Sequence, residues 1–280
     1  MKNTFYTTIL WLISFFISHS AIAQKDVQVT HLTCNHFTNP TGVLAQPVFS
    51  WQSMTDENGQ MQTAYQIMVA SSEKNLAKDN GDIWDSQKVV SDKQTHTEFK
   101  GQTLKSSTVY YWKIKVWDKN NKAWGWSKNA HFITGLVSEN DKKAQWITSN
   151  KEKGQAAPLF RKTFSLKKKP QNAIIHIAGL GYYELYVNGK KVGDHVLDPG
   201  QTNYDEYGFY VTYNIDTLLK KGENVIGVML GDGWYNQDVV WGGGMSYGKP
   251  LFWCQLDTEH KGEKAQIVSD TTWKWINGPI

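Results

Sequence analysis

The feature that most constrains the fold is a succession of short runs of β-branched and aromatic residues, with almost no helical periodicity between them. In the run Tyr110–Trp117, every second residue from Tyr110 is apolar, and Lys113 and Lys115 occupy the other face. Such alternation predicts an antiparallel strand with one buried face and one wet face. Clusters of Gly, Asn, Asp and Lys separate the runs, as turns separate strands. The sequence therefore predicts an all-β protein.

The first group of these runs predicts an immunoglobulin-like sandwich. About seven short strands over roughly 110 residues are typical of that fold. The clearest runs are Val27–Thr33, Val48–Gln52, Ala64–Ala70, Val109–Trp117 and Ala130–Thr134. Their order, with a tyrosine-rich strand and a closing Trp126-Ser127 before Phe132-Ile133-Thr134, resembles a fibronectin type III domain. We assign residues 24–136 to this domain, and the polar segment 137–143 to a linker.

Residues 144–280 predict a second, jelly-roll-like β-sandwich. The apolar run Ala173–Ala178 suits a central strand, and Asn188-Gly189 between two alternating runs predicts a hairpin with a type I′ turn. A short helical turn is expected over Ile215–Lys220. We expect this domain to be truncated at its C-terminal end, since the sequence stops inside a strand-like pattern.

The first 23 residues predict a signal peptide. Lys2 precedes the apolar run Thr7–Ile17, and Ala21-Ile22-Ala23 supplies the small residues that a signal peptidase requires. The run is short for a permanent membrane span. We expect an exported chain, periplasmic or secreted, with no membrane span and no lipid anchor.

Charge and cysteine usage exclude several classes of function. The formal net charge is only +4 and its charges are interspersed, so nucleic-acid binding has no support. Cys34 and Cys254 fit no metal spacing, and we expect two buried free thiols. His176 is expected to be a hydrogen-bonded core residue. The 13 Trp and 13 Tyr suit either sugar stacking or a β-sandwich core, and composition does not separate the two.

The second unit resembles the N-terminal β-sandwich of bacterial α-L-rhamnosidases. The matching pieces are Ala144–Ile147, Pro158–Phe164, Ala178–Gly189, Val192–Gly200, Tyr204–Tyr213 and Gly222–Tyr235, ending in Gly-Asp-Gly-Trp-Tyr. The resemblance implies that the intact protein removes terminal α-L-rhamnose from glycans or glycosides by an inverting mechanism. It also implies a catalytic α/α barrel, for which residues 24–280 have no counterpart. We therefore predict no catalytic residue, and no turnover by this chain alone. Gln201 stands where the family often has Trp.

The loop after the strand Asn224–Leu230 is the candidate site. Glycines permit close approach of another backbone, and aromatic side chains supply a stacking face. We predict either sugar binding or docking of the missing catalytic domain here, with docking favoured because large aromatics anchor interfaces. The residues concerned are Asp232, Trp234, Tyr235, Trp241 and Tyr247.

A calcium site is a further expectation of the resemblance, because some related sandwiches look like calcium-dependent rhamnose binders. Asp198, Asn203 and Asp205 are close in sequence and could contribute the oxygen ligands that a hard cation needs. An ordinary turn at Asp198-Pro199-Gly200 is the alternative, and no cofactor is required. Two other functions stay open for the chain: a free-standing carbohydrate-binding module, and a structural or adhesive β-sandwich protein.

Overall fold

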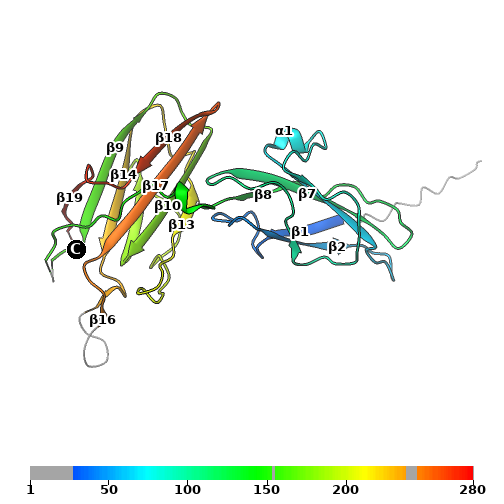
Figure 1. Cartoon of the computed structure of the whole chain (residues 1–280), viewed down its shortest axis with the longest axis horizontal. Coiled ribbons are helices and arrows are strands. Elements are labelled where there is room, and N and C mark those ends of the chain that lie inside the picture. Colours follow the sequence, from blue (N-terminus) through cyan, green and yellow to red (C-terminus); the bar gives the residue numbers. More distant parts are fainter. Residues whose placement is uncertain (1–27, 153–154, 238–244, 280) are drawn as a thin grey trace, which may run out of the picture.

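A computed structural model describes residues 28–152, 155–237 and 245–279, and its elements are nearly all antiparallel strands. Within these ranges the helical elements are the short helix α1 (Glu73–Leu76) and the 3₁₀ turn η1 (Glu139–Asp141). Figure 1 shows two separate groups of sheets, joined through the segment that carries η1. Among the described residues, no helix has the length and apolar character that crossing a membrane requires. The predicted all-β architecture is confirmed.

The first domain is a sandwich of two sheets. One sheet has the strand order β1-β2-β6, and the other has the order β4-β3-β7-β8, with β5 also pairing with β3. Its core is aromatic: the rings of Phe49 and Trp112 lie 4.6 Å apart, and Trp51 is fully buried beside them. The strands are β1 Gln28–Cys34, β2 Val48–Met54, β3 Ala64–Ala70, β4 Trp84–Asp85, β5 Val89–Val90, β6 Thr97–Glu98, β7 Val109–Trp117 and β8 Ala130–Ile133.

The wet face predicted for β7 is wrong at Lys113. Its side chain is buried, because α1 and Trp126 cover that face of the strand. Lys113 Nζ donates a hydrogen bond of 2.7 Å to the carbonyl of Leu76, forms an ion pair with Asp79, and lies 4.6 Å from the centre of the Trp126 ring. A lysine in an alternating strand is therefore part of the packing here.

The second domain is also a sandwich of two sheets. One sheet has the strand order β13-β10-β17-β18, and the other has the order β12-β11-β14-β9-β19. A separate pair, β15-β16, projects at one end (Figure 1). The strands are β9 Pro158–Leu166, β10 Asn172–Leu180, β11 Tyr182–Val187, β12 Lys190–Lys191, β13 Val211–Asn214, β14 Gly222–Gly231, β15 Asn236–Gln237, β16 Met245–Ser246, β17 Leu251–His260, β18 Glu263–Val268 and β19 Lys274–Asn277.

Several local predictions for this domain are confirmed. β10 lies between β13 and β17, and its residues Ala173–Ala178 are all buried. Asn188 and Gly189 take φ values of 50° and 80°, as a type I′ turn requires, and link β11 to β12. The short helical turn expected over Ile215–Lys220 is a single hydrogen-bonded turn, in which the Leu218 amide donates to the Ile215 carbonyl, and the side chain of Asn224 binds the amide and the carbonyl of Lys220.

Both cysteines are buried and free, as expected. Burial raises the pKa of the Cys34 thiol to about 12 and also raises the pKa of Cys254. Neither sulfur is therefore a ready nucleophile at neutral pH.

The two domains meet through polar side chains. His176, on β10, is fully buried, and its Nε2 lies 2.8 Å from Ser107 Oγ of the first domain. Ser107 Oγ also donates to Asp257 Oδ2 at 2.6 Å, and His176 Nδ1 lies 2.9 Å from Thr212 Oγ1. The expectation of a hydrogen-bonded buried histidine is confirmed, with one partner in the other domain. A second link is the bond from the Leu136 amide to Tyr210 Oη, 3.0 Å long.

Candidate functional site at one end of the second sandwich

The site begins where β14 ends. Asp232 follows the last residue of the strand, and its carboxylate is held on both oxygens: Lys151 Nζ lies 2.8 Å from Oδ2, and Asn236 Nδ2 donates to Oδ1 at 3.0 Å. Ser246 Oγ in turn donates to Asn236 Oδ1 at 2.7 Å. Lys151 is almost fully buried in this ion pair, whereas Asp232 is 40% exposed. The result is a fixed carboxylate with one side open to solvent.

Gly233 is required for this turn. Its φ is +52°, and a Cβ atom here would lie 2.9 Å from the backbone nitrogen of Tyr182. A residue with a side chain would be strained at this φ and would also clash with the backbone of Tyr182. Because Gly233 lets the 232–235 turn pack closely against the start of β11, Asp232 and Trp234 are held at this end of the sandwich.

A polar cleft of about 270 Å³ lies beside Asp232. Hydroxyl, amide, carboxylate and ammonium groups contribute to its walls, in the mixture that can bind vicinal hydroxyl groups. Its lining residues are Thr148, Ser149, Lys151, Glu152, Pro158, Asp232, Asn236, Ser246, Gly248, Lys249 and Pro250.

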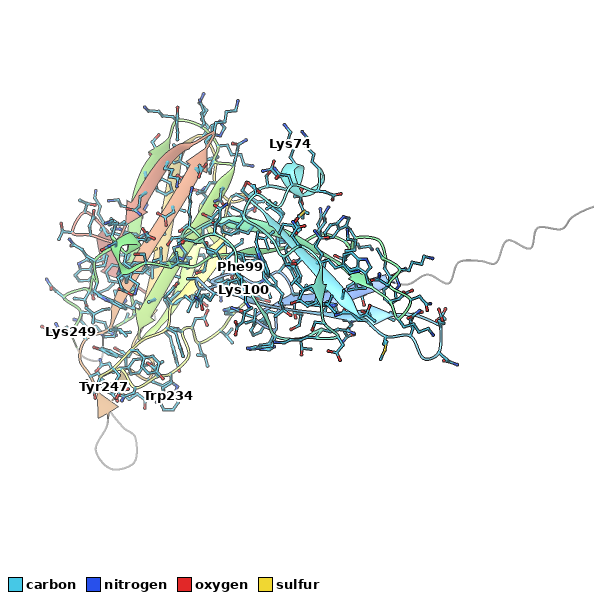
Figure 2. The ribbon with its side chains drawn as sticks, turned by 45° about the vertical axis from the view of Figure 1, so that its right-hand side comes forward. Lys74, Phe99, Lys100, Trp234, Tyr247 and Lys249 are labelled. Atoms are coloured by element: carbon cyan, nitrogen blue, oxygen red, sulfur yellow. The ribbon has the colours of Figure 1, made fainter. Side chains whose placement is uncertain are left out.

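Three tyrosines form a stack next to the cleft. The rings of Tyr235 and Tyr247 are stacked with centres 5.7 Å apart, and Tyr204 meets each of them edge-on at 5.3 Å. Tyr235 is buried in this stack, and burial raises its pKa. Trp234 is 42% exposed, and Figure 2 shows it at the same end of the molecule as Tyr247.

The structure therefore separates the predicted aromatic residues by role. Tyr235 and Tyr247 belong to the internal packing of this end, and Trp234 is available to a partner or ligand. Trp241 lies outside the described residues. Exposed apolar side chains occur on the neighbouring segment 193–210 as well, at Val196, Leu197, Tyr207 and Phe209.

Sequence reasoning missed four residues of this site: Lys151, Tyr204, Asn236 and Ser246. Asn236 lies four residues after Asp232, and that spacing was a usable signal. Lys151 is 81 positions away, so nothing in the local pattern pointed to its ion pair. Tyr204 belongs to a segment that carries the family resemblance, but its local pattern does not point to a contact with Tyr235 or Tyr247.

The three residues predicted to bind calcium have separate local roles. Asp198 Oδ2 accepts a hydrogen bond from Tyr213 Oη at 3.0 Å and lies 2.8 Å from His195 Nδ1. Asn203 Oδ1 accepts from the Asp205 amide at 3.3 Å and so closes its own turn. In the described ranges, no group of three or more His, Cys, Asp or Glu side chains is arranged to hold a metal ion. Calcium binding stays a prediction.

Asp198 has an effect on its tyrosine neighbour. Burial, together with the hydrogen bond to the Asp198 carboxylate, raises the pKa of Tyr213 to about 12. Tyr213 thus stays a neutral donor to Asp198 across the physiological range. This pair fixes the start of the segment that carries Asn203 and Asp205.

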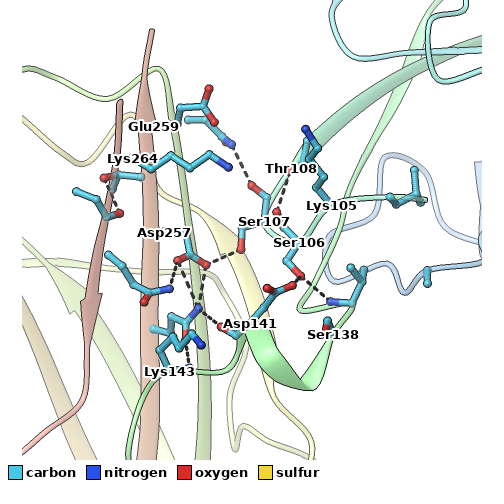
Figure 3. Close-up of a pocket in the computed structure, with 18 of the residues that line it drawn as sticks. Lys105, Ser106, Ser107, Thr108, Ser138, Asp141, Lys143, Asp257, Glu259 and Lys264 are labelled. Carbon is cyan, nitrogen blue, oxygen red and sulfur yellow. Dashed lines mark hydrogen bonds between the residues drawn. The ribbon is translucent and has the colours of Figure 1, made fainter. Parts of the chain in front are cut away.

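A second cleft, of about 610 Å³, lies at the junction of the two domains (Figure 3). Lys105, Lys143 and Lys264 line it together with Asp141 and Asp257. Its lining contains no aromatic side chain, so it offers no stacking face for a sugar ring. Much of its polar surface is already used in bonds within the protein, such as the one from Ser106 Oγ to Asp141 at 2.5 Å. The lining of the cleft beside Asp232 has no aromatic side chain either, but the exposed Trp234 lies on the same turn as Asp232, and this makes the end of the second sandwich the better candidate site.

The fold defines the class of the chain: a pair of β-sandwich domains, with the candidate site on the loops at one end of the second sandwich. Residues 29–138 match the Rha78A-like N-terminal immunoglobulin domain, and residues 168–280 match the α-L-rhamnosidase N-terminal domain. The chain belongs to the α-L-rhamnosidase family and corresponds to the N-terminal, non-catalytic portion of its members.

Relatives and solved structures agree with this placement. An α-L-rhamnosidase from Formosa agariphila is 36% identical over the whole chain, which spans 33% of that protein. The structure of α-L-rhamnosidase from Dictyoglumus thermophilum is 38% identical, with a TM-score of 0.82 over 90% of this chain and 30% of its own. That from Aspergillus terreus is 27% identical, with a TM-score of 0.78 over 91% of this chain and 30% of its own. The chain thus spans about a third of the relatives that it matches.

Proposed function

We propose that this chain is the N-terminal part of an exported enzyme that hydrolyses terminal α-L-rhamnose from glycans or glycosides. The observation that carries the proposal is that both sandwiches match rhamnosidase domains, in the order in which they occur here. Because the chain spans a third of its relatives, the hydrolytic residues are expected in a further catalytic domain, and this region serves in domain docking.

Export is supported by the sequence of residues 1–23, which lie outside the described residues. A signal peptidase would cleave before Gln24, after Ala21-Ile22-Ala23. Expression of the whole chain in a bacterium, followed by N-terminal sequencing of the periplasmic protein, tests this. A protein that begins at Met1 in the cytoplasm would contradict it.

Sugar contact by the end of the second sandwich is a second role, and one observation favours it: the exposed Trp234 lies on the same turn as Asp232, which lines a polar cleft. An aromatic ring can stack on the apolar face of a sugar, while a carboxylate accepts hydrogen bonds from its hydroxyl groups. Lys151 and Asn236 hold Asp232 in one position, which lowers the ordering cost of binding.

Release of p-nitrophenol from p-nitrophenyl α-L-rhamnoside tests the main proposal. We expect turnover by a protein that carries a catalytic domain after residue 280, and none by residues 24–280 alone. Turnover by residues 24–280 would contradict the non-catalytic assignment. The absence of turnover from the longer protein would contradict the proposed activity.

Calorimetry with L-rhamnose, with and without calcium, tests the sugar role on the same sample. The variant Trp234→Ala should lose binding, whereas Trp146→Ala, which removes another exposed tryptophan of the same domain, should not. If both variants lose rhamnose binding equally, or if the wild type does not bind rhamnose, domain docking remains as the proposed role of this surface. Rhamnose binding without turnover in any longer protein would instead favour a free-standing carbohydrate-binding module.

A further inference from the structure

The outer face of the five-stranded sheet in the second domain has an unusual composition. β14 buries Ile226, Val228 and Leu230 toward the inner core, and the residues between them on the outer face are Val225, Gly227 and Met229. An antiparallel strand with one wet face normally alternates apolar with polar residues. A strand that is apolar on both faces is typical of a sheet that is covered on both sides.

The outer face is hollowed into a groove of about 590 Å³. Gly227 lies in its floor, and a Cβ atom added there would meet nothing closer than 3.8 Å. Glycine in the interior of a strand often marks a place where another backbone or a ligand approaches closely. Aliphatic side chains of Leu159, Val225 and Met229 line the groove around it.

One side of the groove is formed by β19, at the edge of the sheet. β19 pairs with β9, and within the described residues its other edge has no partner strand. Ile276, which lies in the same outer-face row as Leu159 and Met229, is 65% exposed. An edge strand with exposed apolar side chains is a template for association with another polypeptide.

The groove carries positive charge only. Arg161 and Lys274 are the charged residues in its lining, and they lie opposite each other in the register of β9 and β19. Neither forms an ion pair with any other described residue. An occupant that supplies carboxylates would neutralise both cations at its margin.

We propose that this groove is a docking surface for the catalytic domain of the enzyme, in addition to the loops around Trp234, and that it binds a segment of apolar side chains flanked by Asp or Glu. The inference rests on the proposed function, which supplies the partner: the relatives are about three times as long as this chain. An aliphatic groove with exposed edge-strand residues fits a polypeptide, whose backbone can approach at Gly227 and whose side chains fill the groove.

Two other occupants fit less well. In a two-fold dimer the same patch meets itself, so Arg161 and Lys274 of two copies would face one another with no acidic partner in the lining. A glycan needs several hydrogen-bonding side chains. Here the hydroxyl of Tyr186 already donates to Glu184 at 2.6 Å, and most of the remaining lining is aliphatic.

The test uses an intact enzyme. The region of the Formosa agariphila relative that matches this chain is replaced by residues 24–280, so that a catalytic domain follows in the same polypeptide. Hydroxyl-radical labelling of Met229 and Ile276, which share the outer face, is then compared between this hybrid and residues 24–280 alone. We expect labelling of both residues to fall at least about fivefold in the hybrid, because docking removes them from water. Labelling of Met54, which is 53% exposed in the first domain, should not change.

A matched pair of variants tests the groove itself. Gly227→Leu fills the floor, and Ser165→Leu adds the same side chain to an exposed position of β9 outside the groove. In the hybrid, Gly227→Leu should restore labelling of Ile276, and Ser165→Leu should not. The double charge reversal Arg161→Glu, Lys274→Glu should also restore labelling, without the folding risk of a larger side chain in a strand interior.

The outcomes separate this inference from the proposed function. If the hybrid hydrolyses p-nitrophenyl α-L-rhamnoside while the groove is labelled as strongly as in the isolated chain, the docking assignment is wrong and the proposed function stands. If the groove is protected in the hybrid, but a protein that carries its own catalytic domain after residue 280 releases no p-nitrophenol, the docking assignment stands and the proposed activity is wrong. Concentration-dependent protection in the isolated chain would assign the groove to a second copy. Protection of the isolated chain by polygalacturonate would assign it to an acidic glycan.

Discussion

Ser107 Oγ lies 2.8 Å from Nε2 of His176, and this bond joins the first sandwich to the second inside the domain junction. The other ring nitrogen, Nδ1, lies 2.9 Å from Thr212 Oγ1. Both nitrogens are therefore engaged by hydroxyl groups, which can serve a neutral imidazole as donor on one side and acceptor on the other. Asp257, whose side chain is partly exposed, shares the Ser107 hydroxyl, so four side chains form one network at the junction.

The junction should weaken in acid. Burial lowers the pKa of His176 from 6.5 to about 4, and the nearby Asp257 carboxylate opposes the shift only in part. Between these two pH values the unfolded chain binds a proton that the folded chain does not, so the free energy of unfolding falls as pH decreases. The contribution is fully present above pH 6.5 and is lost by about pH 4. The loss should be on the order of 1–3 kcal/mol.

Urea unfolding above pH 6.5 and just above pH 4 measures this loss. The variant His176→Gln is the control, because its amide can still bond to Ser107 and Thr212 but does not titrate. The variant should show a smaller decrease than the wild type between the two conditions. An equal decrease in both proteins would mean that other groups cause the acid sensitivity.

Removal of the Ser107 hydroxyl should uncouple the domains. Ser107→Ala leaves the fully buried His176 Nε2 without its hydrogen-bond partner, whereas Asp257 Oδ2 keeps its bond from Gln255, and an unsatisfied buried polar group costs about 1–3 kcal/mol. In calorimetry we expect a lower midpoint and a broader or split transition. Ser138→Ala, at the nearby turn η1, removes a hydroxyl that caps only its own turn, and should have a smaller effect. A sharp single transition at the wild-type midpoint in Ser107→Ala would show that the bond contributes nothing to coupling.

The sequence predicted the fold because its local signals agree with one another. Alternation in Val109–Trp117, the Asn188-Gly189 turn and the apolar run of β10 each point to the element that forms. The prediction failed at Lys113, where periodicity assigns a face but does not show what covers it. The helix α1 that buries this lysine comes from a segment more than 30 positions earlier in the chain.

The candidate site was predictable only in part, for the same reason. Gly231–Tyr235 was found because glycines and aromatics in a loop after a strand are a local pattern. The ion pair of Asp232 with Lys151 and the contact of Tyr235 with Tyr204 depend on how distant loops meet. The groove around Gly227 is formed by four neighbouring strands, and no single strand shows it.

Lys113 should contribute more to stability than its neighbour Lys115. Lys113 is buried and donates to the Leu76 carbonyl, so Lys113→Ala should lower the free energy of unfolding by about 2 kcal/mol. Lys115 is less buried and lies over the rings of Trp117 and Trp126, so Lys115→Ala should cost about 0.5–1 kcal/mol. Chemical denaturation of the two variants measures the difference. Equal small losses would contradict the packed role of Lys113.

Removal of calcium should not unfold the chain. Asp198 is already held by Tyr213 and His195, and Asn203 by its own turn, so the folded state needs no cation at these oxygens. We expect the thermal midpoint in EDTA to equal that in buffer. A rise of several degrees on addition of calcium, absent in Asp205→Asn, would support the predicted metal site, since a ligand that binds only the folded state raises its stability.

Tyr235 and Trp234 are adjacent in sequence, but truncation to alanine should lower the free energy of unfolding only at Tyr235. Tyr235 is buried against Tyr204 and Tyr247, and Tyr235→Ala should lower the free energy of unfolding by about 3 kcal/mol. Trp234 is exposed, and Trp234→Ala should change it by less than about 0.5 kcal/mol. Thermal and urea unfolding of both variants measure these two changes in the free energy of unfolding. A large loss in Trp234→Ala would place that ring in the internal packing and remove it from the surface that a sugar or a catalytic domain could reach.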